Sequence, residues 1–145
     1  MKQVTLYTDG GCRPNPGTGG WAAILIAGSK MKELSGCEPE STNNRMELTA
    51  AIEGLRALKS DCQVTLYTDS QYLRQGITSW IKKWRKNGWR SSTGAVKNKE
   101  LWQELDSLTG RHEIEWRWTK GHAGNPMNER CDELATEAIE QCHQG

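Results

Sequence analysis

The heptapeptide QVTLYTD occupies residues 3–9 and occurs again at residues 63–69. Its alternation of Val, Thr, Leu and Tyr is typical of a β-strand, and each copy ends in an aspartate that precedes a turn-forming residue. If the two strands are parallel neighbours, Asp9 and Asp69 lie side by side at one edge of a sheet. Two such carboxylates repel unless a cation lies between them. The repeat therefore favours a hard metal such as Mg²⁺, with two solvated turn aspartates as the alternative.

The segments between the two copies predict an α/β fold. A Gly/Pro-rich loop is expected at 10–20, a buried strand at 21–27 and a second hairpin arm at 31–37. Apolar residues recur at helical spacing over 42–58. This helix is the crossover to the second copy, and a right-handed strand–helix–strand connection makes the two copies parallel.

The rest of the chain continues the mixed order of elements. The predicted elements are a helix from Ser70 that continues or bends into 82–90, a helix near 98–108, a strand at 113–119, and a last helix capped by Asn125 with Pro126 at its first position. Five strands and about four helices within 145 residues indicate a single α/β domain with a sizeable core.

Charge is distributed unevenly, although the net charge is only +1. Residues 80–99 contain seven basic and no acidic side chains, which leaves 12 basic and 18 acidic residues elsewhere. A cationic patch on an otherwise acidic protein indicates a polyanionic partner, with a solvated helix face as the alternative. Trp80, Trp84 and Trp89 are interleaved with these charges and favour nucleic-acid binding.

Neither a membrane-length apolar run nor a signal-peptide pattern is present, so we expect a cytoplasmic protein without a membrane partner. The five cysteines are an odd number without C-x-x-C spacing, which indicates neither a zinc site nor a disulfide framework. We expect most of them to be reduced packing residues. One intramolecular pair remains open.

Further polar residues are candidates for chemistry. Glu47 lies at the edge of the apolar stripe of its helix, and Asn43 and Asn44 at the helix start suit phosphate or sugar contacts, with ordinary capping as the alternative. Asp132 repeats the position of Glu47 in the last helix, where an exposed helix acid is the common case. His122 follows a strand in a Gly-containing loop and is either a proton carrier or metal ligand, or a solvated loop residue.

Four motifs together resemble one family. These are TDGGCRPNPGTGG at 8–20, NNRMEL at 43–48, YTDSQY at 67–72 and KGHAGNPMNERCDELA at 120–135. They are similar to bacterial ribonuclease HI, the type 1 ribonuclease H family. The resemblance implies the ribonuclease H-like fold, a five-stranded mixed sheet with an antiparallel second strand and helices on both faces. It also implies one domain over 1–145, with a basic handle at about 80–97.

The resemblance further implies an endoribonuclease that hydrolyses the RNA strand of RNA/DNA hybrids and leaves 5′-phosphate and 3′-hydroxyl ends. Its acidic set corresponds to Asp9, Glu47, Asp69 and Asp132, which would hold two Mg²⁺ ions, with Mn²⁺ as a possible substitute. Asp9 would bridge both ions, Glu47 and Asp69 would complete one shell, and Asp132 would serve the other ion. His122 would act as a proton shuttle.

Substrate contacts are implied in two groups, and the enzyme is expected to be a monomer. Contacts to the 2′-hydroxyl groups of the RNA strand correspond to Cys12, Asn15, Asn43, Asn44 and Gln71. Contacts of the handle to the DNA strand correspond to Trp80, Lys82, Lys83, Trp84, Arg85, Lys86 and Trp89.

Three other readings share part of this pattern. A nuclease of the same fold that acts on DNA has a similar acidic cluster, but NNRMEL and the 120–135 motif match the hybrid-cleaving branch. A non-catalytic hybrid-binding module would not require four clustered carboxylates, which are unfavourable without a metal. An embedded reverse-transcriptase domain is the third, and a first strand directly after Met1 favours a free-standing enzyme.

Overall fold

The computed structural model describes residues 1–119 and 125–144, and its main feature is a five-stranded sheet. The strand order is β3-β2-β1-β4-β7. The strands are β1 (Lys2–Arg13), β2 (Gly17–Ala27), β3 (Lys30–Ser41), β4 (Cys62–Thr68) and β7 (Glu113–Trp118), and a separate ribbon consists of β5 (Arg90–Ser91) and β6 (Gly94–Ala95).

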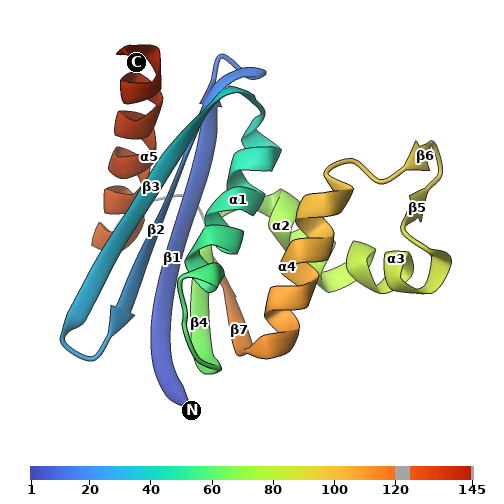
Figure 1. The fold of residues 1–145 in the computed structure, drawn as a ribbon, viewed down its shortest axis with the longest axis horizontal. Helices are drawn as coiled ribbons and strands as arrows, with labels where there is room; N and C mark the ends of the chain where they lie inside the picture. Colours follow the sequence, from blue (N-terminus) through green and yellow to red (C-terminus); the bar gives the residue numbers. More distant parts are fainter. Residues whose placement is uncertain (120–124, 145) are drawn as a thin grey trace.

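Helices cover both faces of this sheet (Figure 1). They are α1 (Asn43–Arg56), α2 (Gln71–Gln75), the π-helical turn η1 (Gly76–Trp80), α3 (Ile81–Asn87), α4 (Lys99–Arg111) and α5 (Pro126–Gln144). Helix α1 packs on β1 and β2 and against α4, whereas α5 packs on β1, β2 and β3 from the other side. Helix α3 and the β5–β6 ribbon extend away from the sheet (Figure 1). The predicted α/β architecture is confirmed.

The two heptapeptide copies are parallel neighbours in register. Val4 pairs with Val64, and the pairing runs on to Tyr7 beside Tyr67. Strand β2 is antiparallel to both β1 and β3, while β1, β4 and β7 are parallel to one another. The predicted mixed sheet with an antiparallel second strand is therefore present.

Strand alternation divides the core into two layers. Leu6 of β1 points toward α1, where it is fully buried in a cluster that includes Leu48 and Ile52. On the other face, Ile24 of β2 packs in a smaller cluster with Leu134 of α5. Full burial of a side chain of this size contributes about 1.5–3 kcal/mol, so both layers hold their helices against the sheet.

Side-chain caps begin three of the helices, as the sequence predicts for Ser70 and Asn125. Thr42 and Ser70 each accept the N–H of the residue three positions later at 3.1 Å. The side-chain oxygen of Asn125 accepts the N–H groups of Met127 and Asn128 at 3.0 and 3.2 Å. Each cap satisfies a donor that the helix itself leaves unpaired.

One predicted loop is mostly strand. The expected loop at 10–20 was wrong because β1 continues to Arg13 and β2 already begins at Gly17. Gly11 pairs with Gly20 in this extension of the hairpin. Glycine weakens a strand by propensity alone, but here the tertiary packing requires backbones without a side chain, as described for the site below.

Two of the five cysteines are bonded to each other. Cys37 of β3 and Cys142 of α5 form a disulfide, which answers the pairing question that the sequence leaves open. The expectation that most cysteines are reduced packing residues is confirmed, since Cys12, Cys62 and Cys131 are free and buried. Among the described residues, no helix is long and apolar enough to cross a membrane.

His112, between α4 and β7, is a buried titratable residue whose contribution to stability depends on pH. Its Nδ1 accepts the N–H of Cys62 at 3.0 Å, and within residues 1–119 and 125–144 its buried Nε2 has no partner. Burial lowers the pKa of His112 below its ordinary value of 6.5, and nearby Arg111 lowers it further. The folded protein therefore holds this ring neutral.

We expect the contribution of His112 to the free energy of unfolding to fall as the pH drops below about 6.5, because the unfolded chain then binds a proton that the folded ring resists. His112→Gln should remove this dependence. Denaturant unfolding of both proteins between pH 5 and pH 8 measures it. If the stability difference between wild type and variant grows toward low pH in favour of the wild type, the folded protein holds this ring charged and not neutral.

Candidate active site

Four acidic side chains line one hollow where β4 ends. Its volume is about 270 Å³, and Asp9, Glu47, Asp69 and Asp132 all contribute to its wall. They come from β1, α1, the residue after β4, and α5. The structure thus brings together all four acidic positions that the sequence motifs single out.

The register of the parallel strands places the first two acids. Asp9 and Asp69 each lie two residues beyond the paired and stacked rings of Tyr7 and Tyr67, whose centroids are 4.8 Å apart. Because side chains two residues apart share a face of a strand, both carboxylates point to the same side of the sheet. The heptapeptide repeat accounts for this pair.

Two glycines bring the other acids to the same place. A Cβ on Gly10 would lie 2.4 Å from the carbonyl carbon of Met46 and 2.6 Å from the nitrogen of Glu47. A Cβ on Gly20 would lie 2.3 Å from the carbonyl oxygen of Ala135, one helical turn after Asp132. Only a residue without a side chain allows α1 and α5 to approach the strands this closely. The presence of glycine is the only sign of these contacts in the order of amino acids.

Substitution of Gly10 by alanine is expected to displace the first turns of α1. An overpacked site of this kind costs about 1–3 kcal/mol of stability, and a small misplacement of Glu47 lowers turnover by roughly 10-fold to 100-fold. Catalytic rates and denaturant unfolding measure the two effects. Gly110→Ala is the matched control, since a Cβ there meets no atom within 4 Å and should leave the rate unchanged. Equal rates for the two variants would contradict the close-approach argument.

The acids of the hollow disfavour one another's charges. Burial raises the pKa of Asp9 to about 8, and the charges of Asp69, Asp132 and Glu47 add to the rise, while a hydrogen bond from the Gly10 N–H opposes it. Burial also raises the pKa of Glu47 to about 7, which the hydroxyl of Ser70 opposes by donating to it and which Asp69 increases. The site stores electrostatic repulsion that a cation would relieve.

Ser70 is a site residue that the sequence singles out only as a helix cap. It is 3% exposed, and its hydroxyl oxygen accepts the N–H of Leu73 while it donates to Glu47. Its own N–H donates to the hydroxyl oxygen of Thr68 at 3.2 Å. One hydroxyl group therefore caps α2 and orients a carboxylate of α1, which fixes the two elements relative to each other.

The donor set of the hollow suits a hard divalent cation. Carboxylate oxygens are the preferred ligands of Mg²⁺, and burial raises the pKa of Asp9 and Glu47, so a nearby cation would favour their charged forms. In the part of the chain that the structure describes, no group of three or more Asp, Glu, His or Cys side chains is already gathered tightly enough to hold a metal ion.

Among the residues assigned to the RNA strand, Asn43 lines the hollow. The side-chain oxygen of Asn15, in the β1–β2 turn, accepts the N–H of Asn43 at 3.1 Å and ties the turn to the start of α1. Asn44 and Gln71 are exposed. The side chain of Cys12 is buried and its thiol donates to the carbonyl oxygen of Ser41, so this side chain is not available to a ligand.

The tryptophans of the handle pack mainly on one another. The ring centroids of Trp80 and Trp84 are 5.9 Å apart, those of Trp84 and Trp89 are 5.6 Å apart, and Trp84 also lies 5.7 Å from Trp102 of α4. They thereby fasten α3 to the main core. Trp80 and Trp84 also line a groove of about 840 Å³, together with Lys83 and other residues.

The basic side chains of α3 fall into two classes. Lys82, Lys83 and Lys86 are exposed, and among the described residues none of them forms an ion pair. Arg85 instead makes a two-pronged ion pair with Asp106 of α4, with an Nε–Oδ2 distance of 3.1 Å. The three lysines are therefore the charges that are free to meet a polyanion. The remaining candidate, His122, lies outside the described residues.

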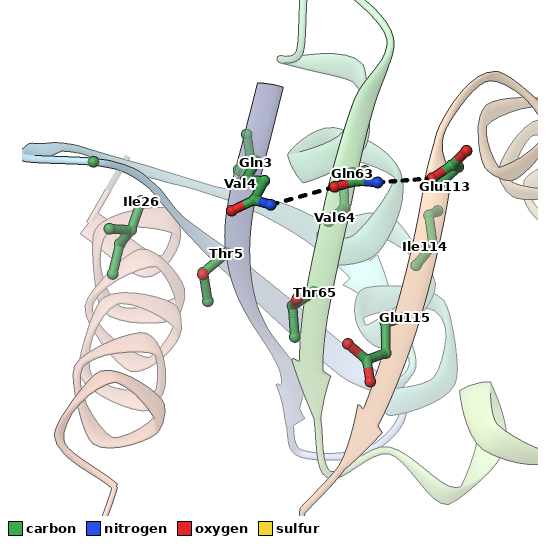
Figure 2. A pocket seen from close by; sticks show the side chains of 11 residues that line it. Gln3, Val4, Thr5, Ile26, Gln63, Val64, Thr65, Glu113, Ile114 and Glu115 are labelled. Carbon is green, nitrogen blue, oxygen red and sulfur yellow. Dashed lines mark hydrogen bonds between the residues drawn. The ribbon is translucent and has the colours of Figure 1, made fainter. Parts of the chain in front are cut away.

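A larger hollow, about 690 Å³, lies over the beginnings of β1, β4 and β7 (Figure 2). Three of its polar side chains are hydrogen-bonded to one another, since Gln3 donates to Gln63 at 3.4 Å and Gln63 donates to Glu113 at 3.0 Å. These residues are at the beginnings of their strands, whereas ligands of open α/β sheets bind at the carboxyl ends. The smaller acidic hollow is the better active-site candidate.

The chain is similar to known proteins of one family. The family model described as RNase H matches residues 1–140. A protein of Hahella chejuensis named Ribonuclease H is 60% identical over 142 residues, which cover 97% of this chain and 96% of that protein.

Two solved structures share the fold. LC9-RNase H1, described as a type 1 RNase H with the type 2 active-site motif, is 32% identical with a TM-score of 0.88, over 97% of this chain and 74% of that chain. LC11-RNase H1 in complex with an RNA/DNA hybrid is 21% identical with a TM-score of 0.66, over 97% of this chain and 99% of that chain. The resemblance read from four sequence motifs is confirmed, and the chain belongs to the ribonuclease H family as a bacterial ribonuclease HI-type enzyme.

Proposed function

We propose that this protein is an endoribonuclease that hydrolyses the RNA strand of RNA/DNA hybrids and leaves 5′-phosphate and 3′-hydroxyl ends. The observation that carries the proposal is the convergence of four carboxylates in one hollow of a ribonuclease H fold. LC11-RNase H1, which shares this fold, was solved with such a hybrid. We further propose a monomer that acts in the cytoplasm.

The acidic hollow is proposed to hold two Mg²⁺ ions, with Mn²⁺ as a substitute. Divalent cations bound there would activate a water molecule and stabilise the leaving 3′ oxygen. Asp9 would ligate both ions, Glu47 and Asp69 one of them, and Asp132 the other. The N–H of Gly10 and the hydroxyl of Ser70 already orient two of these carboxylates and favour their ionised form, which is the form that ligates.

The two strands of the hybrid would meet different parts of the protein. The polar groups at the start of α1 and at Gln71 suit the 2′-hydroxyl groups that distinguish RNA from DNA. The exposed lysines of α3 lie on a separate projection from the sheet and suit the phosphates of the DNA strand (Figure 1). His122 is proposed to carry a proton during water entry or product release.

Cleavage of end-labelled substrates tests this proposal. The native protein with Mg²⁺ is incubated with an RNA/DNA hybrid, duplex DNA, duplex RNA and single-stranded RNA of one sequence. We expect cutting of the hybrid alone. The products should carry 5′-phosphate groups that phosphatase treatment removes. Binding of the hybrid without cleavage would refute the enzymatic assignment, and cleavage of duplex DNA would refute the substrate.

A further inference from the structure

The disulfide between Cys37 and Cys142 joins the edge strand of the sheet to the end of the last helix. Cys37 lies in β3 and Cys142 in the final turn of α5, with their Cα atoms 6.0 Å apart and 105 residues apart in sequence. Figure 1 shows α5 running along the face formed by β2 and β3. The covalent bond thus closes a loop that contains most of the chain, including Glu47, Asp69 and Asp132.

A second connection holds the other half of the same helix. Arg130 makes a two-pronged ion pair with Glu33 of β3, at 2.8 and 3.1 Å, and a further bond to Glu133. It precedes Cys142 by roughly 18 Å along the helix, at a rise of 1.5 Å per residue. Helix α5 is therefore fixed to β3 near Asp132 by charge and at its far end by a covalent bond.

Exposure separates the bonded cysteines from the others. Cys37 is exposed and Cys142 is half-buried, whereas Cys12, Cys62 and Cys131 are buried, with at most 8% of their surface accessible. A thiol from solution can reach the disulfide in the folded protein but cannot reach the free thiols. Accessible disulfides are the ones that exchange with small thiols, and a protein expected in the reducing cytoplasm meets such thiols continuously.

We propose that Cys37 and Cys142 form a reversible oxidation site that exchanges with a small thiol–disulfide couple such as glutathione and sets how firmly α5 is held to the sheet. A glutathione thiolate attacks the exposed sulfur of Cys37, the bond to Cys142 breaks, and Cys142 leaves as a thiolate that takes up a proton. A second glutathione thiolate attacks the glutathione sulfur of the mixed disulfide. Cys37 is released as a thiol, and glutathione disulfide carries away the two-electron oxidation. The reverse sequence restores the protein disulfide.

The two forms differ in stability more than in catalysis. A crosslink that encloses about 100 residues restricts the unfolded chain strongly, so reduction is expected to lower Tm by about 10 °C. The apolar layer around Leu134 and Ala135 still packs α5 on the sheet after reduction. Cleavage rates well below Tm should therefore change little, while the half-life of activity near Tm should shorten markedly.

Thermal unfolding and thiol counting test the proposal on the full chain. The protein is equilibrated across a series of glutathione to glutathione disulfide ratios, alkylated in the native state, and weighed by mass spectrometry. We expect no alkylated cysteine in the oxidised form and two in the reduced form, with Tm following the same transition. A Cys37→Ser, Cys142→Ser double variant is the matched control, and its Tm should equal that of the reduced wild type at every ratio.

Three outcomes overturn the proposal. Two reactive thiols in the air-oxidised protein would show that the bond does not form. A bond that persists in excess glutathione would make it a permanent structural crosslink. Equal Tm values for oxidised wild type and the double variant would show that the bond does not secure α5. None of these readouts depends on the proposed hybrid cleavage.

Discussion

Asp9→Asn is expected to lower kcat for cleavage of an RNA/DNA hybrid by at least about 10³-fold, because several kcal/mol of charge stabilisation by bound cations depends on this carboxylate. Burial and the charges of Asp69, Asp132 and Glu47 all raise the pKa of Asp9. Asp9 therefore interacts with each of the other three acids of the hollow. An amide of the same shape keeps the packing and removes the charge. KM should change little, because the substrate is held mainly by other residues.

The same substitution should stabilise the metal-free protein. The pKa of Asp9 rises from 3.8 to about 8 on folding, so between these values the folded state binds a proton that the unfolded chain releases. Stability of the wild type therefore falls as the pH rises through this window. Asp9→Asn lacks this loss and should unfold at a higher denaturant concentration at pH 8.

Asp61→Asn is the control for both effects, since Asp61 is exposed in the turn before β4. It should leave kcat unchanged and the stability at pH 8 nearly so. Steady-state rates with Mg²⁺ and urea unfolding with a chelator measure the two quantities. Retention of more than a tenth of the wild-type rate by Asp9→Asn would remove Asp9 from the metal site.

Replacing Lys82, Lys83 and Lys86 together by glutamine is expected to raise KM for the hybrid by roughly 100-fold near 0.1 M salt and to change kcat little. These side chains are exposed on α3, which extends away from the sheet (Figure 1). A variant that makes fewer phosphate contacts also releases fewer counterions when it binds the hybrid. The slope of log KM against log salt should therefore become shallower by about 2–3.

Arg85→Gln is the matched control, because Arg85 is held by Asp106. Loss of an exposed ion pair of this kind costs at most about 1 kcal/mol of stability, so the variant should remain folded. Because Arg85 is paired with Asp106, the KM of Arg85→Gln should stay close to that of the wild type. Adding this change to the triple variant should raise KM only slightly further. Unchanged KM of the triple variant in low salt would exclude the lysines from substrate binding.

The sequence predicted the elements whose signals are local. Alternation in the two heptapeptides predicted β1 and β4, and apolar spacing predicted α1 to within two residues at either end. Ser70 and Asn125 marked helix starts because a short polar side chain caps free N–H groups in its own vicinity. These features depend on interactions within a few residues, which the order of amino acids displays directly.

The features that the sequence did not predict depend on contacts between segments that are distant in sequence. Residues 10–13 and 18–21 pair in a hairpin where a loop was expected at 10–20. The glycines that suggested a loop are there because the backbones of α1 and α5 lie against Gly10 and Gly20. The pairing of Arg85 with Asp106 separated one basic residue from its neighbours in the handle. Neither partner lies near the other in the sequence, so no spacing rule indicated the contact.

By itself, the sequence determined the two heptapeptide strands, the caps at Ser70 and Asn125, the four acidic positions and the family, because all of these depend on residue types at short spacing. Only the tertiary structure decided that the four carboxylates share one hollow, that burial and mutual repulsion raise the pKa of Asp9 and Glu47, and that Cys37 meets Cys142. The physical reason is that burial, repulsion and crosslinking depend on distances between segments, and those distances are set when α1 and α5 pack on the sheet.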